Sequence, residues 1–151
     1  MDPAHTAIEE LVHRETRAWD TQDVELLLSI MHADMVWPWP PHPAAHDPLD
    51  WVLVWGRYDR ERWRRGWQQL FDTHDLIHNR RAIQRIAVAE EGDGGFAVVD
   101  IDTLWERRAD RAPQHWRGRA CKLYTRLADG NWCMIAQTGL LDYDGLNTPG
   151  A

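Results

Sequence analysis

The apolar residues of this chain change from helical spacing in the first half to alternation in the second half. An apolar stripe that ends at Trp19 follows a capping box at residues 6–9, which predicts a first helix of roughly four turns. A polar break at residues 20–22 then ends this helix. Asp23 follows the break and can cap a short second helix.

Residues 34–37 predict a short strand, and a proline-rich segment at 38–50 follows it. Because proline interrupts both helices and central strands, this segment is expected to form a loop or lid. A third helix is predicted to begin at Asp59. Its apolar side consists of Trp63, Trp67, Leu70 and Phe71.

Four extended segments separated by turn compositions predict an antiparallel meander after residue 76. The segments are IHNRRAIQRIAV, FAVVDIDTLWER, HWRGRACKLYTR and NWCMIAQTGLL. Three helices and one strand therefore precede four strands, an order typical of the α+β class. We expect a single domain over residues 1–151, with flexible ends at 1–5 and 145–151.

Ten tryptophans are several times the usual share for a chain of 151 residues, and they indicate an aromatic cavity as well as a core. The formal net charge of −7 argues against a nucleic-acid partner. The N-terminal residues lack a targeting pattern and the longest apolar runs are far too short to span a bilayer, so we expect a cytoplasmic protein with no membrane partner. Cys121 is predicted opposite Gln137 or Thr138 rather than Cys133, which argues against a disulfide.

The element order and five short phrases resemble the nuclear transport factor 2-like superfamily, in particular its SnoaL-like branch. The phrases are AWDTQD, HADMVW, HDLIHN, YTRLADGNW and TGLLDY, and the resemblance covers roughly residues 6–143. It implies a cone: a curved mixed or antiparallel sheet wrapped round the three helices, with a pocket between its concave face and the first and third helices. It also implies a small hydrophobic ligand and a homodimer formed through the convex face of the sheet.

The resemblance also implies a catalytic dyad of His78 and Asp20. Members of the scytalone dehydratase and hexachlorocyclohexane dehydrochlorinase type use a histidine at the junction of helix and sheet, oriented by an aspartate just after the first helix. His78 and Asp20 occupy these positions. An imidazole can take up a proton at neutral pH, and a carboxylate on its other nitrogen fixes the tautomer. The alternative is structural: Asp20 ends the helix and His78 is a half-buried strand residue.

The register of the first hairpin decides which face His78 occupies. If paired residue numbers sum to about 185, His78 shares the apolar face with Trp105. Asp100 and Asp102 then lie on the opposite face, with Arg85 across from Asp100 and Arg119 near Asp102. Ion pairing with these two arginines is preferred to an acid/base role. A β-bulge would reverse part of this assignment.

Aromatic and polar side chains around the implied pocket are candidates for substrate contact. Glu15 lies on the inner stripe of the first helix, where an unpaired carboxylate is costly, so it either faces the cavity or meets an Arg. Tyr124 is a candidate water-polarising phenol. The tryptophans that can serve as pocket walls, or simply as core, are Trp19, Trp37, Trp39, Trp63, Trp67 and Trp105.

Two pairs of histidines raise the question of a metal site. His42 and His46 lie in the proline-rich segment, whereas His74 and His78 straddle the end of the third helix, which disrupts their helical spacing. Neither an HExxH motif nor a cysteine cluster accompanies them, so we expect no metal and no organic cofactor.

Two functions fit these observations. The first is a cofactor-independent lyase or dehydratase, or else an isomerase or cyclase, that acts on a small apolar cyclic or polyketide-like molecule through His78 and Asp20. The alternative is a non-catalytic protein of the same fold that binds a hydrophobic ligand or acts as a dimeric accessory module.

Overall fold

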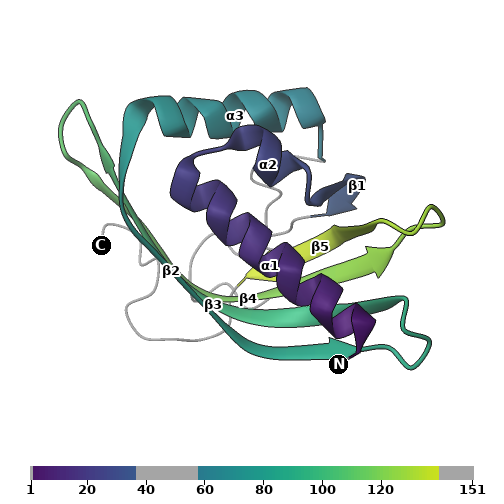
Figure 1. Ribbon diagram of the computed structural model, residues 1–151. Helices are drawn as coiled ribbons and strands as arrows, with labels where there is room; N and C mark the ends of the chain where they lie inside the picture. The colour runs from purple at the N-terminus through teal and green to yellow at the C-terminus, as the bar shows by residue number, and fades with distance from the viewer. Residues whose placement is uncertain (1, 37–57, 140–151) are drawn as a thin grey trace, which may run out of the picture.

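A five-stranded sheet carries all three helices on one side in the computed structural model, which describes residues 2–36 and 58–139 (Figure 1). The helices are α1 (Pro3–Thr21), α2 (Val24–Leu28) and α3 (Arg60–Thr73). The strands are β1 (Met31–Val36), β2 (His74–Val88), β3 (Gly94–Arg107), β4 (Pro113–Arg126) and β5 (Trp132–Gly139). The predicted α+β class is confirmed.

The strand order is β1-β5-β4-β3-β2. Strands β2 to β5 form the predicted antiparallel meander, and β1 pairs with β5 in parallel, which makes the sheet mixed. Figure 1 shows that the sheet is strongly curved and that α1 lies across its concave side. We call this helix-covered side the inner face and the opposite side the outer face.

Helix α1 begins earlier and ends later than predicted. The Asp2 carboxylate accepts a hydrogen bond from the Ala4 N–H at 2.9 Å, and Pro3 occupies the first turn, where its missing N–H has no cost. Asp20 was predicted to lie in a break after the helix but belongs to its last turn. The helix ends at Gln22, which adopts a left-handed conformation with φ of 50°.

The starts of the other two helices follow the prediction. Asp23 Oδ1 accepts from the Leu26 N–H at 3.0 Å, and Asp59 Oδ1 accepts from the Arg62 N–H at 2.9 Å. The apolar side of α3 is buried through Trp63, Trp67 and Phe71. β2 follows α3 directly, with His74 as its first residue.

The predicted register of β2 and β3 is wrong by two to four residues along the strand. Ile86 lies opposite Ala97, and Ile83 lies opposite Val99. One bulge between Ile83 and Arg85 separates these two registers, and a second bulge lies between Leu76 and His78. Each bulge adds one residue to β2 and moves the following side chains to the other face, which the curvature of the sheet requires.

The core between the helices and the inner face is rich in aromatic rings. Trp19 packs edge-on against Trp67 and Trp116, with ring centroids 5.0 and 5.4 Å away, and Trp105 is fully buried beside them. Such perpendicular contacts stabilise aromatic pairs by about 0.5–1.5 kcal/mol beyond the area they bury. The tryptophans predicted as core or pocket wall thus form one cluster; Trp37 and Trp39 lie outside the described residues.

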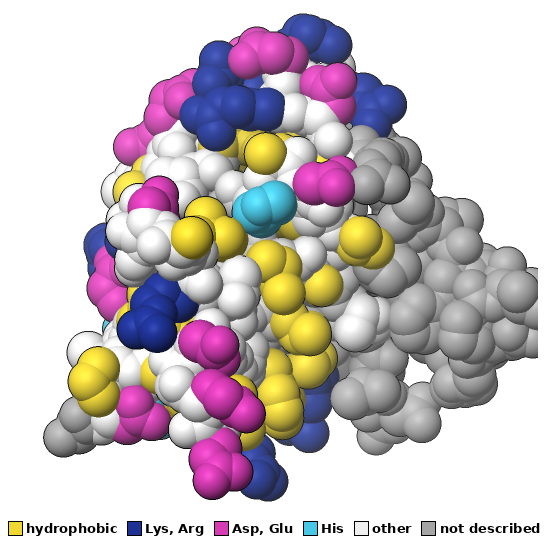
Figure 2. All heavy atoms as spheres, turned by 90° about the vertical axis from the view of Figure 1, so that its right-hand side faces the viewer, with side chains coloured by type: hydrophobic (Ala, Val, Ile, Leu, Met, Phe, Trp, Pro, Cys, Tyr) yellow, Lys and Arg dark blue, Asp and Glu magenta, His cyan; other side chains and the backbone are white. Residues whose placement is uncertain are grey.

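On the side of the molecule where β1 and the β4–β5 turn lie, hydrophobic side chains form a band flanked by charged ones (Figure 2). On the outer face, Phe96, Leu123 and Ala136 lie opposite one another on three adjacent strands. Phe96 and Leu123 are each 38% exposed.

No helix within the described ranges is both long and apolar enough to cross a membrane. Cys121 lies opposite Thr138, as predicted, and both cysteines are free.

Candidate functional site

A buried carboxylate on α1 is held by two cations from the sheet. Glu15, which is 3% exposed, accepts a hydrogen bond from Arg81 Nη1 at 2.7 Å. Lys122 Nζ lies 2.7 Å from each of its two carboxylate oxygens. Trp19 Nε1 donates a further bond to the same carboxylate at 3.1 Å. Glu15 was expected either to face the cavity or to meet an Arg, and it meets Arg81; Lys122 was not foreseen.

Hydrogen bonds extend this contact across the inner face. Arg81 Nε and the Thr103 hydroxyl both donate to Asn79 Oδ1, at 2.8 and 2.7 Å, and Lys122 Nζ donates to Gln137 Oε1 at 3.1 Å. Asn79 Nδ2 in turn donates to Asp20 Oδ1 at 2.9 Å. We call this network the inner polar cluster. It consists of Glu15, Asp20, Asn79, Arg81, Thr103, Lys122 and Gln137.

The buried part of the inner polar cluster has more positive than negative charge. Burial alone would raise the pKa of Glu15, but Lys122 and Arg81 reverse this effect and lower the pKa to about 2. Burial lowers the pKa of Lys122 and of Arg81, and the Glu15 charge opposes that shift in both. One buried carboxylate therefore serves two buried cations, while Asp20 lies exposed at the edge of the cluster.

Two buried polar atoms beside this cluster have no hydrogen-bond partner within the described part of the chain. They are the Tyr124 hydroxyl and Trp105 Nε1, on side chains that are 1% and 0% exposed. Burial, together with the nearby Glu15 charge, raises the pKa of Tyr124 well above its usual value, so the phenol keeps its proton. Because buried polar groups are nearly always paired in proteins, these two atoms are candidate donors to a bound molecule.

The predicted dyad of His78 and Asp20 is wrong as a hydrogen-bonded pair. Asp20 accepts from Asn79, whereas His78 Nε2 lies 2.8 Å from Asp102 Oδ1 on the outer face. The physical reason is the bulge between Ile83 and Arg85: counted from the β2–β3 turn, it moves His78 from the inner to the outer face and gives the inner position to Asn79.

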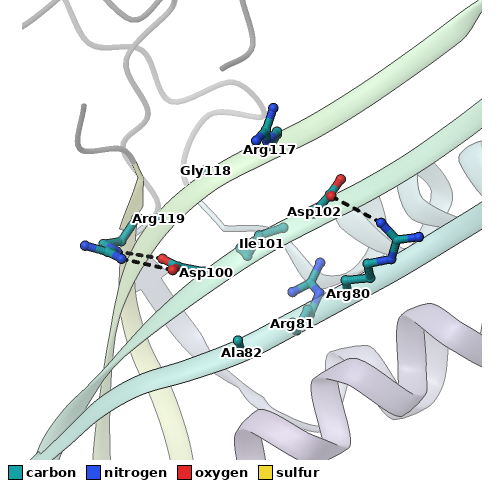
Figure 3. Close-up of a pocket in the computed structure, with 9 residues that line it drawn as sticks. All are labelled: Arg80, Arg81, Ala82, Asp100, Ile101, Asp102, Arg117, Gly118 and Arg119. Atoms are coloured by element: carbon teal, nitrogen blue, oxygen red, sulfur yellow. Dashed lines mark hydrogen bonds and ion pairs between the residues drawn. The ribbon is translucent and has the colours of Figure 1, made fainter. Parts of the chain in front are cut away.

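The outer face carries a charged pocket of about 460 Å³ (Figure 3). Asp100 makes a two-pronged ion pair with Arg119, with contacts of 2.6 and 2.9 Å. The preferred ion-pairing role of this carboxylate is therefore correct, but its expected partner Arg85 lies opposite Val98 instead. Asp102 lies 3.8 Å from Arg80 and opposite Arg117. We call this the outer pocket.

His78, Asp102 and His115 meet at the rim of the outer pocket. His115 Nε2 lies 2.6 Å from the same oxygen, Asp102 Oδ1, that His78 contacts. Burial raises the pKa of Asp102, but the hydrogen bonds from His115 and His78 outweigh it and leave the pKa below its usual value. We call these three residues the outer triad. Asp102 was considered in the sequence as an acid/base or ion-pair residue, but His115 was not singled out.

The family model described as the SnoaL-like domain matches residues 12–135. The chain belongs to the SnoaL-like domain family. A ketosteroid isomerase-like protein from Erwinia carotovora atroseptica SCRI1043 is similar in structure, with a TM-score of 0.68 and 14% identity, covering 91% of this chain and 95% of that one. A conserved protein from Planctomyces limnophilus DSM 3776 has a TM-score of 0.70 and 17% identity, with 89% and 93% covered.

A nuclear transport factor 2-like superfamily protein from Salmonella enterica serovar Typhimurium LT2 covers 95% of both chains, with a TM-score of 0.62 and 15% identity. No curated protein matches the sequence. At these identities the similar structures show the fold alone. The predicted resemblance to the SnoaL-like branch is therefore confirmed, and the chemistry has to be argued from the site itself.

Sequence reasoning about this SnoaL-like chain missed the basic half of its inner polar cluster. Lys122 and Arg81 lie among many charged strand residues, and only the correct register shows which of them point inward. One signal was available. Lys122 alternates with the buried Ala120 and Tyr124, and it is the only lysine among 17 basic residues.

Proposed function

We propose that this SnoaL-like protein binds a small ring-containing molecule with an anionic oxygen against the inner face of the sheet. The observation that carries the proposal is the sharing of Glu15 between Arg81 and Lys122. A buried charge without a partner is costly, so an anionic group of a ligand would balance the second cation. This is the pocket protein of the alternative hypothesis, with a charge requirement added.

The surroundings of the two cations support a ligand of this kind. The Tyr124 hydroxyl and Trp105 Nε1 offer two unpaired donors. Trp19 is 2% exposed, and the Arg81 guanidinium lies 5.5 Å from the centre of its ring. In the proposed complex a flat ring packs among these side chains while its oxygen approaches Lys122. The apolar, cyclic ligand expected from the sequence therefore gains an acidic group.

A second candidate is proton transfer to such a ligand, in an isomerase or lyase reaction without an organic cofactor. Lys122 favours it, because an amine with a pKa lowered by burial can exchange a proton, whereas the arginines used everywhere else in the chain cannot. In this scheme the Lys122 ammonium would give a proton to the ligand, and the neutral amine would regain one from solvent. The Tyr124 hydroxyl would donate a hydrogen bond to the ligand oxygen, while Glu15 orients Lys122. The ketosteroid isomerase-like name of one structural neighbour fits this reaction class.

Calorimetric titration of aromatic carboxylates, each matched with its neutral primary amide, tests the binding proposal. We expect the acids to bind more tightly than the amides, and Lys122→Met to remove the preference. The matched control is Arg119→Met, which deletes a cation from the outer face and should leave the preference intact. Equal affinity of acids and amides for the wild-type protein would contradict the proposal.

Lys122→Arg separates binding from proton transfer. It keeps the positive charge, so an anionic ligand should still bind, but it cannot give up a proton at neutral pH. If the protein is an enzyme, the substitution lowers kcat by about 10²-fold or more with a smaller change in KM. Unchanged turnover in Lys122→Arg would exclude Lys122 as the proton donor or acceptor.

A further inference from the structure

Three side chains from three adjacent strands converge on one point of the outer face. His78 on β2 and His115 on β4 both direct Nε2 at Oδ1 of Asp102 on β3, at 2.8 and 2.6 Å. The rings stand at 85° to each other with centroids 5.9 Å apart. One nitrogen from each histidine and one carboxylate oxygen all lie within 4.8 Å of one another.

The backbone holds these side chains in place. His78 and His115 are both opposite Leu104, one on each side of β3, and Asp102 lies two residues before Leu104 on the same face. The bulge between Ile83 and Arg85 brings His78 into this row. Because all three positions belong to hydrogen-bonded strands, little backbone order has to be gained when the side chains bind a common ligand.

We propose that the outer triad is a binding site for a divalent transition-metal ion, with Zn²⁺ as the preferred occupant. Two imidazole nitrogens and one carboxylate oxygen are a common three-residue ligand set for zinc, which leaves a fourth position for water or another molecule. The same set suits Fe²⁺, Co²⁺ and Ni²⁺, and affinity rises along that series. This site lies on the face opposite the inner polar cluster, so it is independent of the proposed ligand there.

The three ligand atoms of the outer triad need to move only slightly to bind an ion in common. Metal–ligand bonds of about 2.0–2.1 Å in a tetrahedron separate neighbouring ligand atoms by roughly 3.3 Å. Each histidine therefore has to move away from the carboxylate by on the order of half an ångström. When the ion binds, each Nε2 bonds to the metal and the ring proton lies on Nδ1, since the ligands bind as neutral imidazole and carboxylate.

Arginine side chains near the outer triad limit how tightly it can bind a cation. Arg80 faces the other oxygen of Asp102 at 3.8 Å, and Arg117 lies opposite Asp102 on β4. Glu106, on the same face, lies 3.7 Å from Arg111. The positive charges of Arg80 and Arg117 weaken cation binding at the triad. The Arg80 contact is to Asp102 Oδ2, however, so Oδ1 contacts the two histidines and can bind the ion. The side chains of His78, Asp102 and His115 are 23, 32 and 42% exposed, so an ion can enter from solvent.

The test is a titration of the chelator-treated full chain with Zn²⁺ alone, in competition with a chromophoric chelator at a pH where imidazole is neutral. We expect one ion per chain and a loss of Zn²⁺ affinity of at least about 100-fold in His115→Gln and in Asp102→Asn. Mutation of residues that only hydrogen-bond to metal ligands already lowers metal affinity by about 10- to 100-fold, so loss of a ligand should cost at least as much. Circular dichroism confirms that each variant is folded.

Two control variants separate this site from the other histidines and carboxylates. His74→Gln removes a histidine from the same strand as His78, and Asp100→Asn removes a carboxylate from the same strand and face as Asp102. Both should bind Zn²⁺ like the wild type. In nitrogen NMR of the unmodified protein, Nε2 of His78 and of His115 should shift on titration.

Failure of the wild-type chain to bind one equivalent of Zn²⁺ would overturn the proposal. Equal affinity in all four variants, or nitrogen shifts confined to histidines other than His78 and His115, would do the same, because the ion would then be bound elsewhere on the chain. The eight histidines of the sequence make this control necessary.

Discussion

Replacement of Glu15 by Gln should destabilise the protein strongly at neutral pH. The substitution keeps the shape of the side chain but leaves Arg81 and Lys122 with no carboxylate, and their side chains are only 5% and 1% exposed. Removing one partner of a buried ion pair typically costs about 3–5 kcal/mol, because an uncompensated buried charge remains.

The pKa of Glu15 gives an independent estimate of the same quantity. A pKa lowered from 4.5 to about 2 corresponds to roughly 3 kcal/mol of stabilisation of the ionised, folded form. This stabilisation is present above pH 4.5, the ordinary pKa, and is lost as the pH falls through the interval between 4.5 and about 2. Glu15→Gln should therefore cost about 3–5 kcal/mol at pH 7 and much less near pH 2.

Urea unfolding followed by circular dichroism at pH 7 and at several acidic pH values measures these differences. The matched control is Glu10→Gln, since Glu10 pairs with Arg14 and Arg17 at the surface of the same helix and should change the free energy of unfolding by less than about 1 kcal/mol. If Glu15→Gln unfolds before it can be measured, Lys122→Met combined with it should recover part of the loss. A loss below about 1 kcal/mol at pH 7 would refute the reasoning.

Two further predictions concern substitutions in the strands of the sheet. Gly95→Ala places a Cβ against the Ala87 carbonyl oxygen and 2.8 Å from Ile8 Cδ1, so it should lower the free energy of unfolding by about 1–3 kcal/mol. Gly94→Ala, whose nearest contact is 3.4 Å, should cost less, and urea titration compares the two variants. We also propose the expected homodimer through the outer-face row of Phe96 and Leu123; Leu123→Glu should then shift the mass measured by light scattering from dimer to monomer, and a monomeric wild-type protein would contradict the proposal.

Most of the fold follows from local patterns in the sequence. Helix caps at Asp23 and Asp59 depend on a few neighbouring residues, and the aromatic side of α3 follows from its 3.6-residue period. The meander follows from alternation and turn composition, and the placement of Cys121 opposite Thr138 follows from one short turn. These features are decided within a few residues and need no knowledge of the rest of the chain.

The candidate site was harder to predict because it depends on two bulges in β2. A bulge accommodates the curvature of the whole sheet. The residue types at the two bulge positions, Ile77 and Gln84, do not predict it. Without the bulges, His78 faces inward and the basic partners of Glu15 cannot be identified. The prediction at Glu15 succeeded because the cost of burying a carboxylate on α1 requires a cation, whichever strand provides it.

The bulge between Ile83 and Arg85 has a consequence for comparing this chain with distant homologues. His78 and Asn79 are adjacent in sequence, yet one belongs to the outer triad and the other to the inner polar cluster. Loss of the one extra residue between Ile83 and Arg85 would exchange their locations without altering either side chain. A sequence alignment that matches every letter of HDLIHN can therefore assign a histidine to the wrong face of the sheet. Residue roles should be transferred between relatives by superposed backbone positions instead.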